Sequence, residues 1–156
     1  MEHYINHVFG EAYNIIWDLS VTSGSDVVTL YIKNTGTKTL ILEGFNAQVS
    51  ADMEVYAKFG VTGTPVGGTD MEVGNLNAGS ANILRSTALQ GDGITGLSGG
   101  NIMWRSKLAA SNQSGFVNFD ADLIITPQQT MAVYATSTIN WSSIGFFVGW
   151  VDQGIE

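Results

Sequence analysis

Apolar and polar residues alternate along most of this chain, which is the pattern of strands with one buried and one solvated face. The stretch 53–61, MEVYAKFGV, shows it clearly, because every second residue from Met53 to Val61 is apolar. Turn sequences such as TSGS and NTGTK separate the alternating segments. The predicted strands, about nine in number, are residues 13–21, 26–34, 39–45, 53–61, 81–89, 101–108, 115–126, 130–138 and 143–152.

No segment shows a helical apolar period with capping residues, although residues 81–89 would also fit a short helix. The segment 62–70, TGTPVGGTD, has the composition of a loop. Many short strands at this spacing predict an all-β fold, an antiparallel β-sandwich of the jelly-roll type with about eight to nine strands. No linker or repeat divides the chain, so we expect one jelly-roll domain over residues 13–156. Residues 1–12 would form an N-terminal arm or an edge segment.

The composition narrows the range of partners. The net charge is −8 with six basic residues, and no basic cluster offers the cationic surface that a nucleic-acid backbone requires. The absence of cysteine excludes disulfides and thiolate metal sites. No apolar run approaches the roughly 18 residues of a membrane helix, and the N-terminus shows no signal-peptide pattern. We therefore expect a protein made in the cytoplasm, with no nucleic-acid and no membrane partner.

The stretch GDGITGLSGG, residues 91–100, contains the pattern G-x-G-x-x-G at Gly91, Gly93 and Gly96. In a dinucleotide site a helix begins within this turn, and its N-terminus holds the pyrophosphate. The residues that follow are glycine-rich and then alternate as a strand does, so no cofactor is expected. We predict instead a surface loop between two strands, with Gly91, Asp92 and Gly93 near a contact with another subunit.

The sequence contains no recognisable catalytic constellation. His3 and His7 are its two histidines; their spacing lacks the glutamate of a zinc hydrolase motif, which favours a solvated terminal pair. Asp120 and Asp122 lie two apart on one predicted strand and share a face, which is either solvated or holds a weakly bound Ca²⁺. A glycosidase needs carboxylates that flank the scissile bond, which two neighbours on one strand do not provide. We therefore expect no enzyme activity, no cofactor and no firmly bound metal.

Aromatic and apolar residues near the C-terminus are candidates for contacts with other molecules. The last predicted strand is apolar on both faces, so it is either buried on both or meets another subunit. Phe147, Trp150 and Val151 are its candidate contact residues. Trp141, near a turn in the stretch INWSSIG, is the best candidate for an exposed aromatic residue that binds a glycan.

Two stretches of the chain resemble tailed-phage capsid decoration (cement) proteins of the jelly-roll type. Residues 61–105 resemble a recurring virion pattern in which a T-P-V segment leads to NLNAGS, then to ITGLSGG and a strand. Residues 123–150, which include LIITPQQTMAVYAT and GFFVGW, resemble the last strands of jelly-roll proteins on virions. The first 50 residues carry no such likeness.

The resemblance implies a virion structural protein that sits on the outer capsid surface. Such a protein binds the major capsid protein, stabilises the shell and forms a homotrimer, and its glycine-rich loops reach neighbouring subunits or the capsid. An acidic protein that does not seek packaged DNA is compatible with an outer position. The alternative function is a receptor-binding or tail-fibre head module that recognises a host surface glycan.

Overall fold

The computed structural model describes residues 10–20, 26–47, 52–110, 115–136 and 142–151, and their regular structure is entirely β-strand. This part of the chain therefore contains no helix that could span a bilayer. The strands are β1 (Ala12–Ser20), β2 (Val27–Asn34), β3 (Leu40–Ala47), β4 (Met53–Val66), β5 (Thr69–Asp70), β6 (Glu72–Asn75), β7 (Ser86–Leu108), β8 (Gly115–Ile125), β9 (Thr130–Ala135) and β10 (Ser142–Val151).

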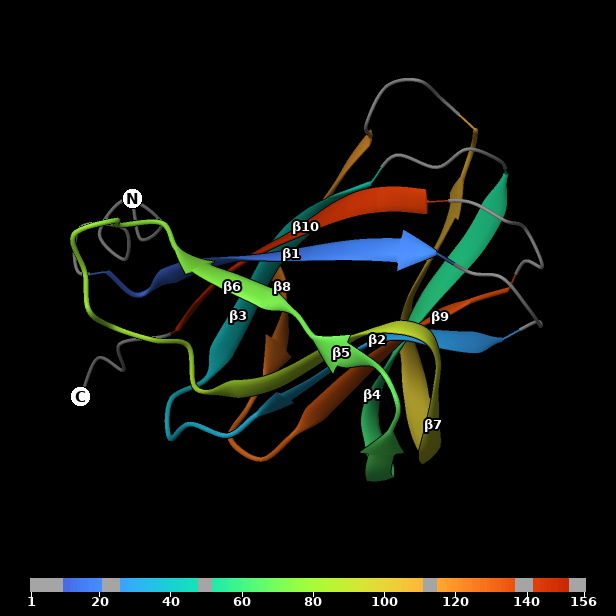
Figure 1. Cartoon of the computed structure of the whole chain (residues 1–156), viewed down its shortest axis with the longest axis horizontal. Helices are drawn as coiled ribbons and strands as arrows, with labels where there is room; N and C mark the ends of the chain where they lie inside the picture. The colour runs from blue at the N-terminus through green and yellow to red at the C-terminus, as the bar shows by residue number, and fades with distance from the viewer. Residues whose placement is uncertain (1–9, 21–25, 48–51, 111–114, 137–141, 152–156) are drawn as a thin grey trace.

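The strands form two sheets in which neighbouring strands are antiparallel. The first sheet has the order β6-β1-β10-β3-β8, and the second has the order β2-β9-β4-β7-β5. Figure 1 shows β1 beside β10 in the upper part of the view, with β4 and β7 reaching its lower edge. The prediction of an all-β antiparallel sandwich is confirmed.

The two sheets enclose an apolar core to which strands of both contribute. Around Trp104 the core is aromatic: this ring lies edge-on to Phe45, with centroids 5.1 Å apart, and 5.4 Å from the ring of Phe119. Each such aromatic pair adds roughly 0.5–1.5 kcal/mol beyond the burial of its area. The fully buried members of the core are Leu30, Ile32, Leu42, Ile125, Met131 and Ala135.

The second sheet also buries the face that points away from the first sheet, because the sheet curls into a ring and encloses that face. The second half of β7 pairs with β4 and the first half with β2, while β9 joins β2 to β4. The inside of this ring is a second core, and all six residues of β9 are buried. Its buried members are Val28, Tyr31, Tyr56, Val61, Ile94, Ala132 and Tyr134.

The second core corrects the predicted assignment of faces. The alternation of residues 53–61 correctly puts Met53, Val55 and Ala57 in the core between the sheets. Tyr56, which the pattern puts on the solvated face, is 6% exposed because the curled sheet covers it. Val61 belongs to the second core rather than the first, because Gly60 at φ +72° precedes it and breaks the alternation.

Three predicted boundaries were wrong, and glycine is the cause in two of them. Residues 62–66 continue β4, although TGTPVGGTD has a loop composition, and the stretch GDGITGLSGG lies inside the 23-residue strand β7. Glycines with positive φ bend these strands and bulge them without ending them. Of residues 81–89, the first five have no regular structure and the rest are strand, so the helix alternative was wrong.

The first described strand begins at Ala12, the last residue of the predicted N-terminal arm. Residues 1–9 of the predicted arm lie outside the described residues. The division into an N-terminal arm, residues 1–12, and a single domain over residues 13–156 therefore stays a prediction.

Candidate functional site

The longest two strands extend beyond the rest of their sheet and form an arm, which we define as residues 60–66 and 95–103. Strand β9 pairs with β4 only over Val55–Phe59, and from there onward β4 pairs with β7 alone. The arm lies at the lower end of the view in Figure 1. Pro65 fits this position, because proline in a sheet needs an edge where its missing N–H is not required. The arm is thus a two-stranded projection over residues 60–66 and 95–100, and residues 101–103 lie at its base, opposite the part of β4 that also pairs with β9.

The backbone of the arm is shaped by glycines that no other residue replaces without strain. Gly63 has φ +104° and Gly96 has φ +80°, and Gly63 pairs with Leu97, the residue next to Gly96 on the facing strand. A Cβ atom on Gly63 would collide with the carbonyl oxygen of Gly96, and a Cβ atom on Gly96 with that of Thr64. The close approach of the two strands therefore depends on both glycines.

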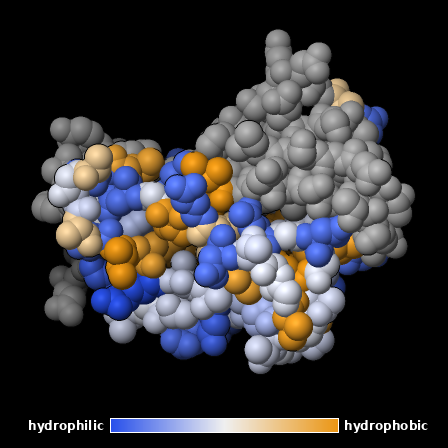
Figure 2. All heavy atoms as spheres, in the orientation of Figure 1, coloured by the Kyte–Doolittle hydropathy of each residue, from blue (hydrophilic) through white to orange (hydrophobic). Residues whose placement is uncertain are grey.

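The arm presents apolar side chains to solvent. Val66 is 61% exposed, Ile102 46% and Met103 57%. Figure 2 shows apolar atoms at the lower end of the molecule, among residues of weak polarity. No residue of the arm carries a charge, although the chain as a whole has a net charge of −8. The arm can therefore meet another acidic surface without charge repulsion.

The base of the arm is held by stacked tyrosines and two cations. The rings of Tyr56 and Tyr134 stack with centroids 5.0 Å apart, and Lys58 Nζ lies 5.0 Å from the centre of the Tyr134 ring. Arg105 Cζ lies 5.3 Å from the centre of the Tyr56 ring. The Tyr56 hydroxyl donates to Asp26 Oδ1 at 2.8 Å, and burial, followed by this bond, raises its pKa. This cluster ties β4, β7 and β9 to the segment before β2.

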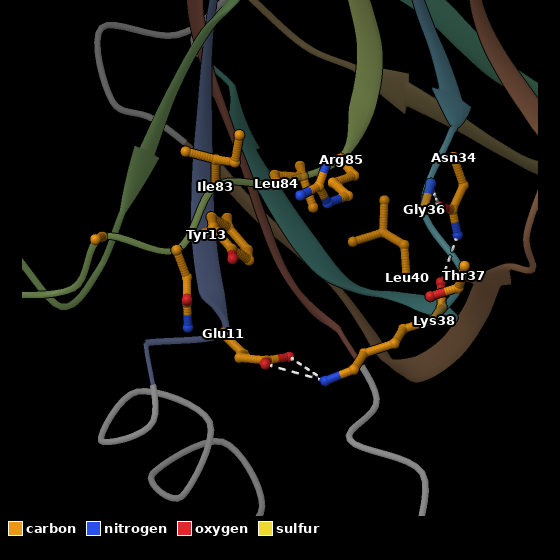
Figure 3. Close-up of a pocket in the computed structure, with 12 residues that line it drawn as sticks. Glu11, Tyr13, Asn34, Gly36, Thr37, Lys38, Leu40, Ile83, Leu84 and Arg85 are labelled. Carbon is orange, nitrogen blue, oxygen red and sulfur yellow. Dashed lines mark hydrogen bonds and ion pairs between the residues drawn. The ribbon is translucent and has the colours of Figure 1, made fainter.

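A second candidate site is a pocket of about 270 Å³ between the β2–β3 turn and the segment before β7. Figure 3 shows Tyr13 on one side, Leu40 on the other, Arg85 above them and a Glu11–Lys38 ion pair below. In this pair Lys38 Nζ lies 3.1 Å from Glu11 Oε1. Burial and, to a lesser degree, the charge of Glu11 raise the pKa of Tyr13. The remaining lining residues are Asn34, Gly36, Thr37, Ala81, Asn82, Ile83 and Leu84.

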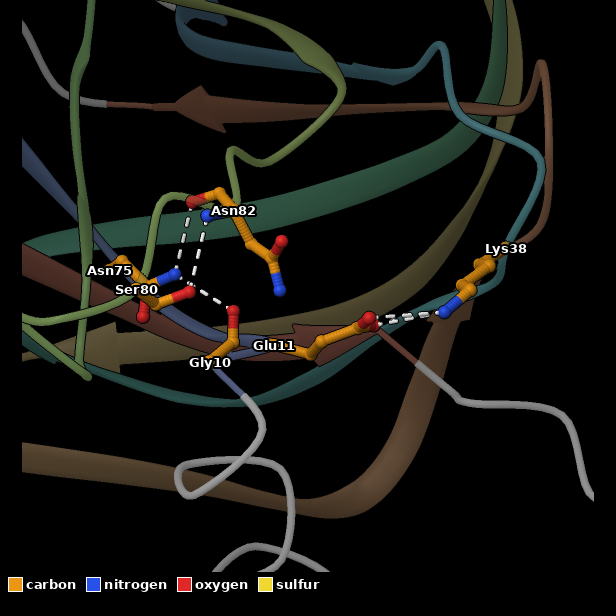
Figure 4. Close-up of polar contacts among 6 residues, drawn as sticks. All are labelled: Gly10, Glu11, Lys38, Asn75, Ser80 and Asn82. Carbon is orange, nitrogen blue, oxygen red and sulfur yellow. Dashed lines mark hydrogen bonds and ion pairs between the residues drawn. The ribbon is translucent and has the colours of Figure 1, made fainter.

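Asparagine side chains fix both walls of the pocket. Asn34 Nδ2 donates to the carbonyl oxygens of Lys38 and Ile125, each at 2.8 Å, and Asn34 Oδ1 accepts from the Gly36 N–H. On the other wall, Asn75 Nδ2 donates to the carbonyl oxygens of Gly10 and Asn82, at 2.8 and 3.0 Å (Figure 4). The pocket is therefore preformed.

The glycine-rich motif does not form the predicted surface loop. Gly91, Asp92 and Gly93 lie within β7, between the residues that pair with β5 and those that pair with β4. Gly91 has φ +138°, and a Cβ atom on it would lie 3.4 Å from the Cα atom of Gly68. The positive φ at Gly91 and Gly93 is a conformation that favours glycine, and the strand continues to Leu108, where a dinucleotide site would have a helix. The predicted subunit contact stays a prediction.

The paired aspartates lie on β8, an edge strand of the first sheet that pairs with β3. Leu42 pairs with Leu123 and Gly44 with Asn118, so Asp120 and Asp122 belong to a bulge in β8 opposite Glu43. The side chains of the two aspartates lie outside the described part of the structure. Among the described residues, no group of three or more His, Cys, Asp or Glu could hold a metal ion. The Ca²⁺ alternative stays a prediction.

The C-terminal candidates lie on the central strand of the first sheet. Strand β10, which contains Phe147, Trp150 and Val151, pairs with β1 on one side and β3 on the other. The structure describes the backbone of this strand but not its side chains, so their role as contact residues stays a prediction. Trp141, like both histidines, lies outside the described residues.

Sequence reasoning missed both the pocket and the apolar surface of the arm. Tyr13 and Arg85 are 72 positions apart in the sequence (85 − 13), and no local pattern predicts that they line one cavity. The exposure of Met103 could have been predicted, because the alternation of residues 101–108 puts it on the polar face with Arg105. An apolar residue at a polar position is a candidate for an exposed contact.

Comparison of the chain with protein-family models, with curated proteins and with solved structures found no match. The function is therefore inferred from the geometry of the arm and of the pocket.

Proposed function

We propose that this protein is a non-enzymatic virion structural protein, a capsid decoration (cement) protein of a tailed phage. It is made in the host cytoplasm, binds the outer surface of the major capsid protein shell as a homotrimer, and stabilises that shell. The observation that carries this proposal is the arm. It offers a neighbouring protein two strand segments without charged residues, with exposed apolar side chains at Val66 in the projection and at Ile102 and Met103 at its base.

The shape of the arm supports a role in clamping. Its glycines hold a defined backbone with positive φ at Gly63 and Gly96, and Thr130 Oγ1 donates to the Val61 carbonyl at 2.7 Å, which anchors the arm to β9. A contact element that is ordered before it binds loses less conformational entropy on binding. The apolar residues of a preordered arm therefore contribute more of their burial energy to the affinity for the capsid.

The strand order supports a jelly-roll topology, which we propose as part of the same assignment. Without the short strands β5 and β6, the first sheet reads β1-β10-β3-β8 and the second β2-β9-β4-β7. Strands that follow each other in the chain then lie in different sheets, apart from β4 and β7. This is the arrangement of eight strands in two Greek keys.

The test is the heat stability of capsids that lack the protein, measured after adding it back. The wild-type protein should raise the temperature at which the shells release their DNA, whereas the variant Ile102→Ser/Met103→Ser should bind weakly and raise it less. The matched control is Ile83→Ser, because Ile83 is 71% exposed but lies outside the arm. Equal capsid stability with and without the wild-type protein would refute the cementing role.

The homotrimer is tested separately by sedimentation of the purified protein, both free and after release from capsids. Three chains per particle are expected in both samples. A monomer in both would overturn this part of the proposal and leave capsid binding to be decided by the heat assay.

The second candidate function is recognition of a host surface glycan by a receptor-binding or tail-fibre head module. The preformed pocket beside Tyr13 favours it, because a single small ligand fits its volume of about 270 Å³. A glycan array probed with the purified protein tests this role. Binding that is lost in Ile83→Ser and kept in the arm variant would support it, and a flat array would refute it.

A further inference from the structure

Tyr13 lies in the pocket with a hydroxyl group that has no hydrogen-bond partner among the described residues. The residue is only 4% exposed, but its hydroxyl oxygen is not among the buried oxygen atoms that lack a partner, so it is open to the space of the pocket. An accessible hydroxyl on a side chain that is otherwise held in place can exchange water for a ligand at little entropic cost. A molecule bound in the pocket can therefore form a hydrogen bond with it. The hydroxyl can act as donor or acceptor.

Arg85 provides an unpaired cation at the same pocket. The other cation of the pocket, Lys38, is neutralised by Glu11, whereas Arg85 makes no ion pair within the described part of the chain. Its backbone is fixed, because the Arg85 carbonyl accepts the Thr35 N–H at 3.0 Å. A guanidinium group presents two parallel N–H donors that match a carboxylate. The pocket therefore favours an anionic ligand.

The rest of the lining has two apolar residues on opposite sides and a carboxylate below them. Leu40 forms a buried apolar surface on the side facing Tyr13, and Ile83, which is 71% exposed, lies beside Tyr13 at the rim (Figure 3). Below them, the Glu11 carboxylate can accept hydrogen bonds in addition to its ion pair. A ligand that fits has one apolar face, several hydroxyl groups and one negative charge. The volume, below the roughly 300 Å³ at which drug-sized sites begin, limits it to about one ring.

We propose that the pocket binds a single sugar ring that carries a carboxylate, as in a terminal uronic acid of an acidic surface glycan. The carboxylate binds Arg85, ring hydroxyls bind Tyr13 and Glu11, and the apolar face of the ring packs on Leu40. This inference rests on the second proposed function, glycan recognition, and names its ligand class. It does not depend on capsid decoration.

The charge of the protein adds a condition to this proposal. A net charge of −8 repels a long acidic polymer at a distance, whereas the contact with Arg85 is local. Salt at about 0.15 M screens charges beyond roughly 8 Å. Glucuronate should therefore bind in physiological salt, and a terminal acidic sugar is a better ligand than the middle of a polyanion.

The experiment is a protein-observed NMR titration with glucuronate, glucuronate methyl ester and glucose. Glucuronate should shift the backbone signals of residues 36–38 and 81–85, and should bind about tenfold or more tightly than the uncharged sugars. The methyl ester serves as the matched ligand control, because it removes the charge and alters no protein residue. Equal binding of all three sugars, or shifts confined to other parts of the protein, would overturn the proposal.

Variants then assign the contacts. Arg85→Gln should weaken glucuronate binding by about tenfold or more, and Tyr13→Phe by about threefold to tenfold. The matched controls are Lys107→Gln and Tyr31→Phe, which do not line the pocket and should leave the affinity unchanged. Unchanged binding in Arg85→Gln would refute the assigned contact.

The glycan array separates this inference from the function on which it rests. If glucuronate binds in the pocket but no glycan on the array binds, the proposed sugar site is supported and the receptor-binding function is refuted. If the array shows binding that survives Arg85→Gln, glycan recognition stands and this pocket is not its site.

Discussion

Replacing Gly96 by alanine tests whether the two strands of the arm approach each other as closely as the structure shows. Gly96 has φ +80°, and a Cβ atom there would collide with the Thr64 carbonyl oxygen on the facing strand. Alanine therefore introduces two separate costs, backbone strain and a steric clash with the backbone. Gly60 is the matched control, because it has a similar φ of +72° and no atom within 4 Å of an added Cβ.

The two costs have different magnitudes. A non-glycine residue in the left-handed region loses about 1–2 kcal/mol, of which a lower unfolded-state entropy returns roughly 0.4–1 kcal/mol. Gly60→Ala should therefore lower the free energy of unfolding by about 1 kcal/mol. A forced displacement of packed atoms adds about 1–3 kcal/mol, so Gly96→Ala should lose about 3 kcal/mol in total.

Urea unfolding, followed by tryptophan fluorescence, gives both free energies, and thermal unfolding checks them. For a chain of this size 1 kcal/mol shifts Tm by about 2–4 °C, so the expected shifts are about 2–4 °C for Gly60→Ala and about 6–12 °C for Gly96→Ala. Gly96→Ala should also bind capsids more weakly. Equal losses of stability in the two variants would refute the close approach of the strands at Gly96.

Three further predictions concern hydrogen bonds that hold the arm and the pocket. Asn34→Ala should lower the free energy of unfolding by about 2 kcal/mol, and Asn34→Asp should lower it by more at pH 7, because a carboxylate then faces two carbonyl oxygens. The Asp variant should recover stability as the pH falls and its carboxyl is protonated. Urea titrations that show no such recovery would contradict this. Thr130→Val keeps the shape but leaves the Val61 carbonyl without its donor, so the same assay should show a loss of about 1–2 kcal/mol and a more protease-sensitive arm. The pKa of Tyr56 is raised above its ordinary value of 10, so the contribution of this residue to stability is present below pH 10 and is lost as the pH rises from there toward the raised pKa. Tyr56→Phe, which also loses the bond to Asp26, should make stability fall less steeply above pH 10. An unchanged alkaline unfolding curve would contradict the assignment.

Strands whose buried face is decided by alternation could be predicted from the sequence. Met53, Val55 and Ala57 were assigned to the core correctly, because side chains on a strand point alternately to opposite faces. The sandwich class followed from the number of such strands and from their spacing. This reasoning needs only local pattern, and it succeeds wherever one face is apolar and the other is solvated.

The rest of the fold depends on contacts that a local pattern does not contain. Tyr31 and Tyr56 are buried because the sheet curls over them, and that curl arises from the pairing of β7 with β2 as well as β4. Glycine-rich segments were assigned to loops because glycine is common there, but positive φ at Gly63 and Gly96 occurs within paired strands. The pocket forms where segments distant in the sequence meet, and no spacing of residues predicts it.

The position of β9 has a consequence for how the chain folds as it is synthesised. This strand lies between β2 and β4, is buried on both faces and contributes to both cores, yet it spans only Thr130–Ala135. Neither core can close until these residues have left the ribosome. Folding of the sandwich should therefore be cooperative and slow for its size, in the range of milliseconds to seconds typical of domains dominated by distant strand pairs. Until then the apolar strands β2 and β4 lack the partner that lies between them, and this is the stage at which the protein is most open to aggregation.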